Sequence, residues 1–150
     1  MSYNVFLVAY LGAPRNHHGL FIKTDLASKC GIHLHVKGDI QNGMELEEKS
    51  TNNPETSANF VEISPLGWVA AGDLDPMRHI CMSIPAPKKQ FNSSKRLYPK
   101  EPLRRCQERT NEAIDSLARD VSYEWATDGQ SSSVGQTKKR KGKGKGRGKA

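Results

Sequence analysis

The sequence predicts an α+β fold in which a mostly antiparallel sheet packs against one C-terminal helix, with about four to six strands in the sheet. The first part of the chain contains short segments rich in Val, Ile, Leu, Phe and Tyr, several of which alternate apolar and polar residues, as half-buried strands do. A later segment repeats apolar residues at helical spacing. Strands in succession followed by a helix indicate an α+β arrangement.

The strands are expected where β-forming residues gather between turn signals. Residues 32–37 show the pattern best, because Ile32, Leu34 and Val36 share one face while His33 and His35 share the other. Gly and Pro residues separate the expected strands at positions 12–14 and 38–39, and polar loops are expected at 49–57 and 86–102. The expected strands and extended pieces are 4–10, 18–23, 32–37, 44–47, 59–64, 66–70 and 79–84.

The helix is expected over residues 103–121. Pro102 suits the position where a helix begins, because its missing N–H would have no partner there. Apolar or small residues recur on one face at helical spacing and are expected to pack on the sheet: Cys106, Thr110, Ala113 and Leu117, with Ile114 and Val121 beside them.

Charge divides the 150-residue chain into two unequal parts. The run from Lys138 to Lys149 holds eight of the 23 Lys and Arg residues and no acidic residue, so the net charge of +7 belongs to this end of the chain. The Gly-, Ser- and Lys-rich composition after residue 125 cannot form a packed core. We therefore expect one globular domain over 1–125 and a disordered basic tail over 126–150.

The basic tail matches two kinds of partner. Lys138, Lys139, Arg140 and Lys141 form a run typical of nuclear-localisation signals. The same charges would bind nucleic acid or anionic lipid through phosphates, with little sequence preference. A tail that only increases solubility is the alternative interpretation.

The cysteines and the N-terminus indicate where the protein resides. Cys30, Cys81 and Cys106 are odd in number and widely spaced, which argues against a disulfide framework and for a reducing compartment. The apolar run from Val5 to Leu11 is too short to span a bilayer, and no other segment is long enough. The expectation is an intracellular protein, cytoplasmic or nuclear, without a transmembrane segment.

Cys106 is the candidate nucleophile. It stands near the start of the expected helix beside Arg104 and Arg105, and a helix N-terminus and neighbouring cations both favour the thiolate. The alternative is that Cys106 is simply a small buried residue, as most free cysteines are.

Histidines at strand starts are the candidate bases for such a thiol. His17 is in phase with Gly19 and Phe21 on the second expected strand, so its imidazole could meet that of His33 or His35 if the two strands are neighbours. For each histidine, an exposed polar position is the alternative.

Metal chemistry fits the sequence poorly. Cys30, His33 and His35 cluster in "CGIHLH", but no further Cys or His pair completes a ligand set. Asp73 and Asp75 in "GDLDP" could pair as acids, but turn chemistry explains them more simply. We expect no metal and no cofactor.

The segments "HHGLFI", "GIHLHVKGDIQNGMELE" and "RRCQERTNEAI" together resemble circularly permuted papain-like proteins. That group includes lecithin retinol acyltransferase-like enzymes, and related permuted folds occur in PPPDE-like peptidases. The similarity to uncharacterised small fungal proteins with "NHH-apolar" and "HV-x-G…GM" segments is closer still. The resemblance covers about residues 4–121 and rests on the order and placement of its parts.

This resemblance implies a catalytic triad in which Cys106 is the nucleophile, His17 the base and His35, or else His33, the orienting residue. The implied activity is a thiol-dependent hydrolase or acyltransferase that acts on an amide, isopeptide or thioester of a protein or acyl substrate. Arg105 stands where the acyltransferase-like motif has asparagine, and Arg109 near its usual aromatic. A catalytically inactive permuted papain-like binding module carrying the basic tail is therefore the alternative.

Overall fold

A computed structural model describes residues 1–12 and 15–120, together with the backbone of 124–125. The expected basic tail over 126–150, including Lys138, Lys139, Arg140 and Lys141, lies outside these residues, as does Val121. Within the described part, no helix is long and apolar enough to cross a bilayer.

The main sheet is antiparallel throughout and has the strand order β4-β3-β2-β1-β5-β8. The predicted fold class, an antiparallel sheet with a C-terminal helix, is confirmed. The strands of this sheet are β1 (Ser2–Tyr10), β2 (His17–Lys23), β3 (Gly31–Asp39), β4 (Gly43–Thr51), β5 (Phe60–Ala70) and β8 (Glu124–Trp125).

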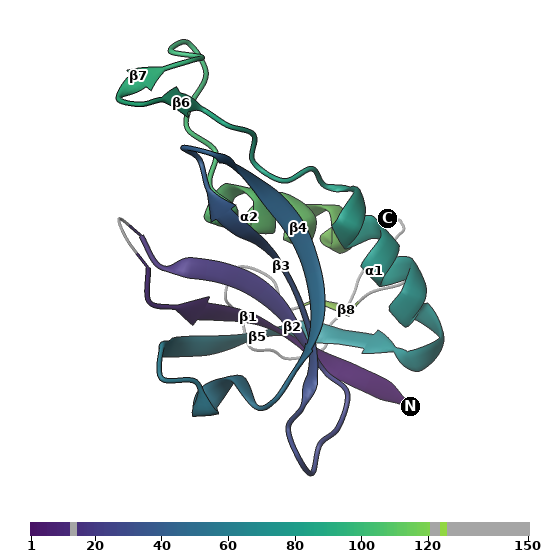
Figure 1. The fold of residues 1–150 in the computed structure, drawn as a ribbon. Coiled ribbons are helices and arrows are strands. Elements are labelled where there is room, and N and C mark those ends of the chain that lie inside the picture. The colour runs from purple at the N-terminus through teal and green to yellow at the C-terminus, as the bar shows by residue number, and fades with distance from the viewer. Residues whose placement is uncertain (13–14, 121–123, 126–150) are drawn as a thin grey trace.

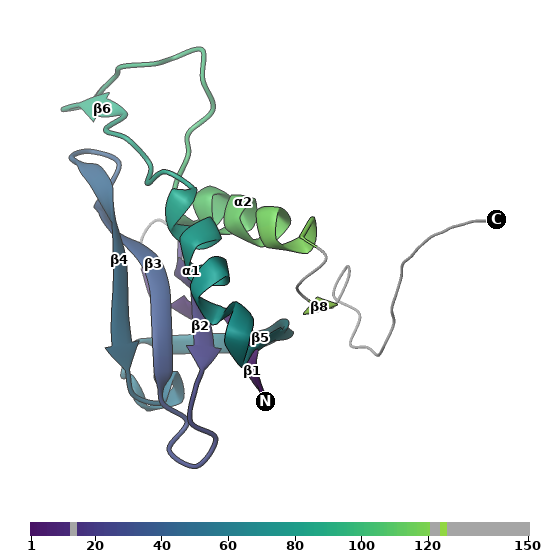
Figure 2. The same cartoon turned by 90° about the vertical axis from the view of Figure 1, so that its right-hand side faces the viewer.

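Both α-helices, α1 (Leu74–Ser83) and α2 (Cys106–Ala118), cover the same face of the sheet (Figures 1 and 2). This face supplies alternate residues of the strands to the core, as the phase of residues 32–37 predicts. The core is fully buried and combines Val5, Leu20, Ile22, Leu34 and Val69 from the strands with Met77, Cys81, Ala113 and Leu117 from the helices.

The expected extended segment over residues 79–84 is wrong, because these residues belong to the end of α1 and its C-cap, Ile84. A short apolar run does not distinguish a strand from a buried helical turn. The residues "GDLDP", expected to form a turn, instead span a 3₁₀ turn (η2, Ala71–Asp73) and the start of α1. Pro76 is tolerated there because the first turn of a helix has free N–H groups.

The helix α2 is shorter than the sequence predicts. It begins at Cys106 because Arg105 has an extended backbone and acts as the N-cap, where its N–H donates to a Glu108 carboxylate oxygen at 2.7 Å. Pro102 therefore lies before the helix. The predicted inward face is confirmed for Cys106, Thr110, Ala113 and Leu117, all of which are buried.

Three connections also depart from the expected pattern. The strand β4 continues to Thr51, so the loop expected over 49–57 is shorter and contains a 3₁₀ turn (η1, Pro54–Thr56). The two apolar pieces expected over 59–64 and 66–70 form one strand, β5, whose register with β1 shifts between Val5 and Phe6. The expected loop over 86–102 carries a small hairpin of β6 (Phe91–Asn92) and β7 (Lys95–Arg96).

The connection from β4 to β5 positions the site. These strands are consecutive in the chain but β3, β2 and β1 lie between them in the sheet, so the connection must cross from one side to the other. It does so on the face opposite the helices, where residues 52–57 line a pocket with side chains of β1, β2 and β3.

Candidate active site

The first part of β2 is separated from β3 and contacts α2 instead. The β2–β3 ladder pairs only Leu20–Lys23 with Gly31–Leu34. Beside the start of β2, which pairs with β1 but not with β3, the His18 N–H donates to Cys106 Sγ at 3.5 Å, and Thr110 Oγ1 donates to the His18 carbonyl at 3.4 Å. The first turns of α2 thus satisfy backbone groups that a neighbouring strand would otherwise pair.

Gln107 also joins the start of α2 to the residues before β2. Its side-chain amide donates to the carbonyl of Asn16, and its oxygen accepts from the Cys106 thiol at 3.6 Å. The nucleophile predicted from the sequence is therefore held against the backbone of residues 16–18. It lies directly beside the strand start that carries His17.

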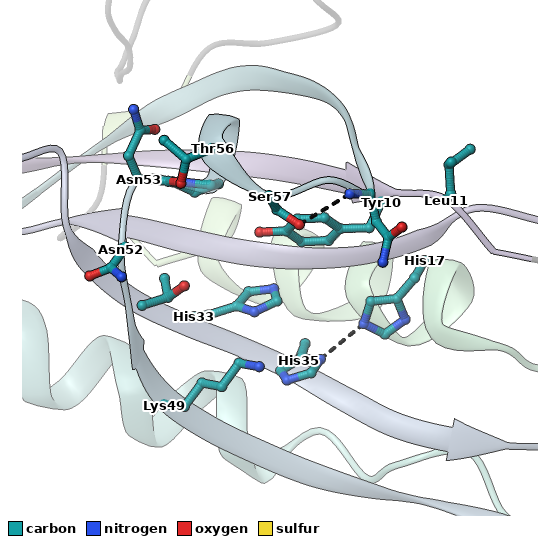
Figure 3. A pocket seen from close by; sticks show the side chains of 13 residues that line it. Tyr10, Leu11, His17, His33, His35, Lys49, Asn52, Asn53, Thr56 and Ser57 are labelled. Atoms are coloured by element: carbon teal, nitrogen blue, oxygen red, sulfur yellow. Dashed lines mark hydrogen bonds between the residues drawn. The ribbon is translucent and has the colours of Figure 1, made fainter.

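The imidazoles of His17 and His35 meet on the other face of the sheet, opposite the helices. His17 Nε2 lies 2.9 Å from His35 Nδ1, and His35 Nε2 lies 2.7 Å from Glu47 Oε1 (Figure 3 shows the pair of rings). The predicted contact between a β2 histidine and a β3 histidine is present in the structure. Glu47 lies opposite His35 in β4. Because it accepts a hydrogen bond from His35, the side chains of His17, His35 and Glu47 form one hydrogen-bonded chain.

The hydrogen-bonded chain His17–His35–Glu47 determines which ring nitrogens carry a proton. An ionised Glu47 only accepts hydrogen bonds, so His35 must carry its proton on Nε2 and leave Nδ1 as an acceptor. The bond to His17 then requires a proton on His17 Nε2. A neutral His17 consequently has its lone pair on Nδ1, which is the nitrogen that could accept a proton.

Burial keeps these imidazoles neutral at physiological pH. It is the main cause that lowers the pKa of His17 to about 4, with the charge of a protonated His35 as the next cause. Burial also lowers the pKa of His35, although the hydrogen bond and negative charge of Glu47 oppose the shift. The histidine pair is therefore in the form that can accept a proton.

The pKa of the Cys106 thiol is raised, whereas the sequence predicts a lowered one. Burial raises the pKa of Cys106, and this outweighs the hydrogen bond from the His18 N–H and the positive charge of Arg15, which act in the opposite direction. Arg104 is engaged elsewhere, in a salt bridge with Glu112. The expected thiolate-favouring effect of Arg104 and Arg105 is not observed, because the side chain of Cys106 is only 6% exposed.

A pocket of about 490 Å³ opens beside the histidine pair, on the side away from the helices. His33 stacks on His35 with ring centroids 4.1 Å apart, and the ring of Tyr10 meets His33 edge-on (Figure 3). The connection from β4 to β5 forms one wall of the pocket. Its lining residues are Tyr10, Leu11, His17, His33, His35, Lys49, Thr51, Asn52, Asn53, Pro54, Thr56, Ser57 and Asn59.

Because Gly19 has no side chain, the stacked rings of His33 and His35 can pack against its backbone. A Cβ at this position would lie 2.4 Å from His33 Nε2 and 2.9 Å from the Cβ of His35. We expect Gly19→Ala to destabilise the protein by about 1–3 kcal/mol, since overpacking forces neighbouring groups to move. Urea unfolding measures this, with Gly72→Ala as the matched control because a Cβ at Gly72 meets nothing within 4 Å. Equal midpoints for the two variants would contradict the packing described here.

The structure brings together only part of the predicted triad. His17 and His35 are hydrogen-bonded, but no hydrogen bond joins Cys106 Sγ to an imidazole among the described residues. His18 points toward the helix side, in phase with Leu20, and only its backbone touches Cys106. Glu47 is the member that sequence reasoning missed. The only signal for it was the alternation of the strand over residues 44–47.

Cys30, His33 and His35, the candidate metal ligands of the sequence, contact different groups. Cys30 contacts Ser28 and Asn52 at the turn before β3, whereas His33 and His35 face the pocket. In the ranges 1–12 and 15–120, no group of three or more His, Cys, Asp or Glu side chains could hold a metal ion.

Residues 5–121 match the model of a family of unknown function, DUF6540. The chain belongs to the DUF6540 family. No curated protein and no solved structure shows a significant match to it. The matched range begins in β1 and ends beyond α2, so this DUF6540 member carries within it both the histidine chain and Cys106.

Proposed function

We propose that the protein is a thiol-dependent hydrolase or acyltransferase acting on an amide, isopeptide or thioester. The observation that carries this proposal is the hydrogen-bonded chain His17–His35–Glu47, placed at the strand start whose backbone holds Cys106 Sγ. A base, the group that orients it and a thiol at a helix N-terminus are the parts that acyl transfer through cysteine requires.

In the proposed reaction, Cys106 Sγ attacks the carbonyl carbon of the substrate and forms a thioester. The thiol proton passes to His17 Nδ1, and His17 returns it to the leaving nitrogen or sulfur as the bond to the acyl carbon breaks. Water, or an acceptor nucleophile, then attacks the thioester and gives its own proton to His17, which returns it to Cys106 Sγ as the carbon–sulfur bond breaks and the acid or transferred product leaves. His35, held by Glu47, keeps the His17 ring oriented and its Nδ1 unprotonated between steps.

Cys106 Sγ and the His17 imidazole must approach each other when substrate binds, because no hydrogen bond joins them among the described residues. Catalytic hydrogen bonds in empty sites are often long, so this gap is compatible with the proposed reaction. The N–H groups at the start of α2 are the available donors for the oxyanion that forms at the carbonyl.

An activated acyl ester tests the proposal directly. We expect p-nitrophenyl acetate to acetylate Cys106, as located by mass spectrometry of its peptide, and to release nitrophenolate in a burst followed by slower turnover. Cys30 is the internal control, because it is more exposed than Cys106 and its thiol contacts Ser28 and Asn52 instead of the start of β2. Acetylation that favours Cys30, with no burst, would count against the reaction.

The pH dependence of acylation follows from the pKa of His17. Neutral His17 is the reactive form, and its pKa is lowered to about 4, so acylation should be nearly constant around neutral pH and fall as pH drops through about 4. Stopped-flow acylation measures this, with circular dichroism to show that the fold persists. A limb near the ordinary histidine value, about 6.5, would mean that His17 is not the buried base.

A non-catalytic binding module is the second candidate. It is favoured because Cys106 is buried and is not among the residues that line the pocket. In this case the basic tail would bind DNA or RNA in a salt-sensitive manner. Replacing Lys138, Lys139, Arg140 and Lys141 together with alanine should then weaken binding to duplex DNA at low salt, and unchanged binding would exclude this role for the tail.

A further inference from the structure

Among the residues that the structure describes, the lining of the pocket is mostly polar and includes no acidic side chain. Within this part of the chain, Lys49 is its one side chain of fixed positive charge, and His17, His33 and His35 supply imidazoles. Most of the other lining residues are amides and hydroxyls, which can donate hydrogen bonds: Tyr10, Thr51, Asn52, Asn53, Thr56, Ser57 and Asn59.

We propose that this pocket binds a small anionic group, a carboxylate or a phosphate, against Lys49 and the imidazoles. The inference does not depend on the thiol reaction, since Cys106 is not part of the pocket. If the protein is an acyl-transfer enzyme, the anion is a group of its substrate, held next to His17.

Lys49 is well placed for this role. It pairs with His33 across the β3–β4 ladder, so its side chain extends from the same face as the stacked imidazoles. Its Nζ lies 4.0 Å from Glu47 Oε1, but that oxygen already accepts from His35, and Lys37 lies 3.6 Å from the other oxygen. The negative charge of Glu47 is therefore shared among two lysines and one histidine, so it does not fully neutralise Lys49.

His33 can offer one ring N–H to a ligand. The residue is 4% exposed, and its Nε2 is buried against Gly19 with no hydrogen-bond partner among the described residues. Orphaned buried N–H groups are rarer in proteins than orphaned acceptors, so the neutral ring should leave Nε2 as the bare acceptor and carry its proton on Nδ1. That Nδ1–H is the donor that His33 can give to a ligand.

The charges around the rings predict how binding depends on pH. The pKa of His33 is lowered to about 3 and that of His17 to about 4, chiefly by burial and then by the charges of other histidines and of Lys49. Other titratable groups near the rings are Tyr10, which meets His33, Glu47, which accepts from His35, and Lys37, which lies 3.6 Å from Glu47. A bound anion would raise the imidazole pKa values, so binding should take up protons and tighten as pH falls.

The experiment titrates the full-length protein with succinate in one arm and inorganic phosphate in the other, at about pH 5 and about pH 8. Side-chain NMR signals of His33 and His35 report binding in the pocket, so anions that bind elsewhere do not count. Both arms use Cys106→Ser protein as well as wild type, which separates this test from that of the acyl-transfer reaction.

We expect one arm to shift the His33 and His35 signals, with tighter binding at the lower pH, and the responding arm identifies carboxylate or phosphate. Lys49→Gln should weaken binding about tenfold, the loss expected for one charge-assisted hydrogen bond. Lys29→Gln, on the turn before β3, should leave it unchanged. No shift in either arm, or equal binding by the two lysine variants, would overturn the proposal.

Discussion

Replacing Cys106 with serine is expected to eliminate the acyl-enzyme and to lower ester turnover about a thousandfold or more. A serine hydroxyl is a far weaker nucleophile than a thiol, but it still accepts a hydrogen bond. It can therefore keep the contact from the His18 N–H that Cys106 makes at 3.5 Å. The loss should be chemical and not structural, as judged by nitrophenolate release together with an unchanged urea midpoint.

Two comparisons make this result specific. Cys30→Ser should retain full turnover, because the Cys30 thiol lies at the turn before β3, where it contacts Ser28 and Asn52. His17→Ala should lower the acylation rate about 10²- to 10⁴-fold, the usual contribution of a general base. If Cys106→Ser turns over ester at the wild-type rate, the proposed reaction is wrong, whatever the pocket binds.

Replacing Arg109 with methionine is expected to destabilise the fold by about 3 kcal/mol or more. Arg109 is completely buried, and its guanidinium donates to the carbonyl of Cys81 and to that of Ile84 at 3.2 Å. These carbonyls lie at the end of α1, where backbone acceptors lack partners within the helix. Methionine keeps most of the buried stem, so the loss reports the polar contacts.

Urea unfolding of Arg109→Met measures this cost, and Arg119→Ala is the matched control. Arg119 is exposed at the end of the same helix and its guanidinium donates to Ser116 Oγ at 3.3 Å, so its removal should change stability by less than about 0.5 kcal/mol. If Arg109→Met is as stable as wild type, Arg109 does not anchor α1.

The face of the sheet on which each strand side chain lies could be predicted from the sequence, because alternation of apolar and polar residues is a local property. Ile32, Leu34 and Val36 alternate with His33 and His35, and the structure places the first set toward the helices and the histidines toward the pocket. The phases also predicted that a histidine at the start of β2 could meet His33 or His35, and the structure gives His35 as the partner of His17. The inward face of α2 was visible in the same way.

Other elements depend on contacts between distant segments, which periodicity does not encode. The run over residues 79–84 is apolar enough for either a strand or a helix, and packing of α1 against α2 decides for the helix. Glu47 is one of several acidic residues in its strand. It joins the site because the β3–β4 register sets it opposite His35.

The sequence by itself determined the fold class, the faces of the strands and helix, and the residues to examine. The tertiary structure decided the proton positions in the chain His17–His35–Glu47, since those depend on which ring nitrogen meets which partner. It also decided the state of Cys106. The local sequence favours a thiolate, but burial between α2 and the start of β2 removes the water that would stabilise one.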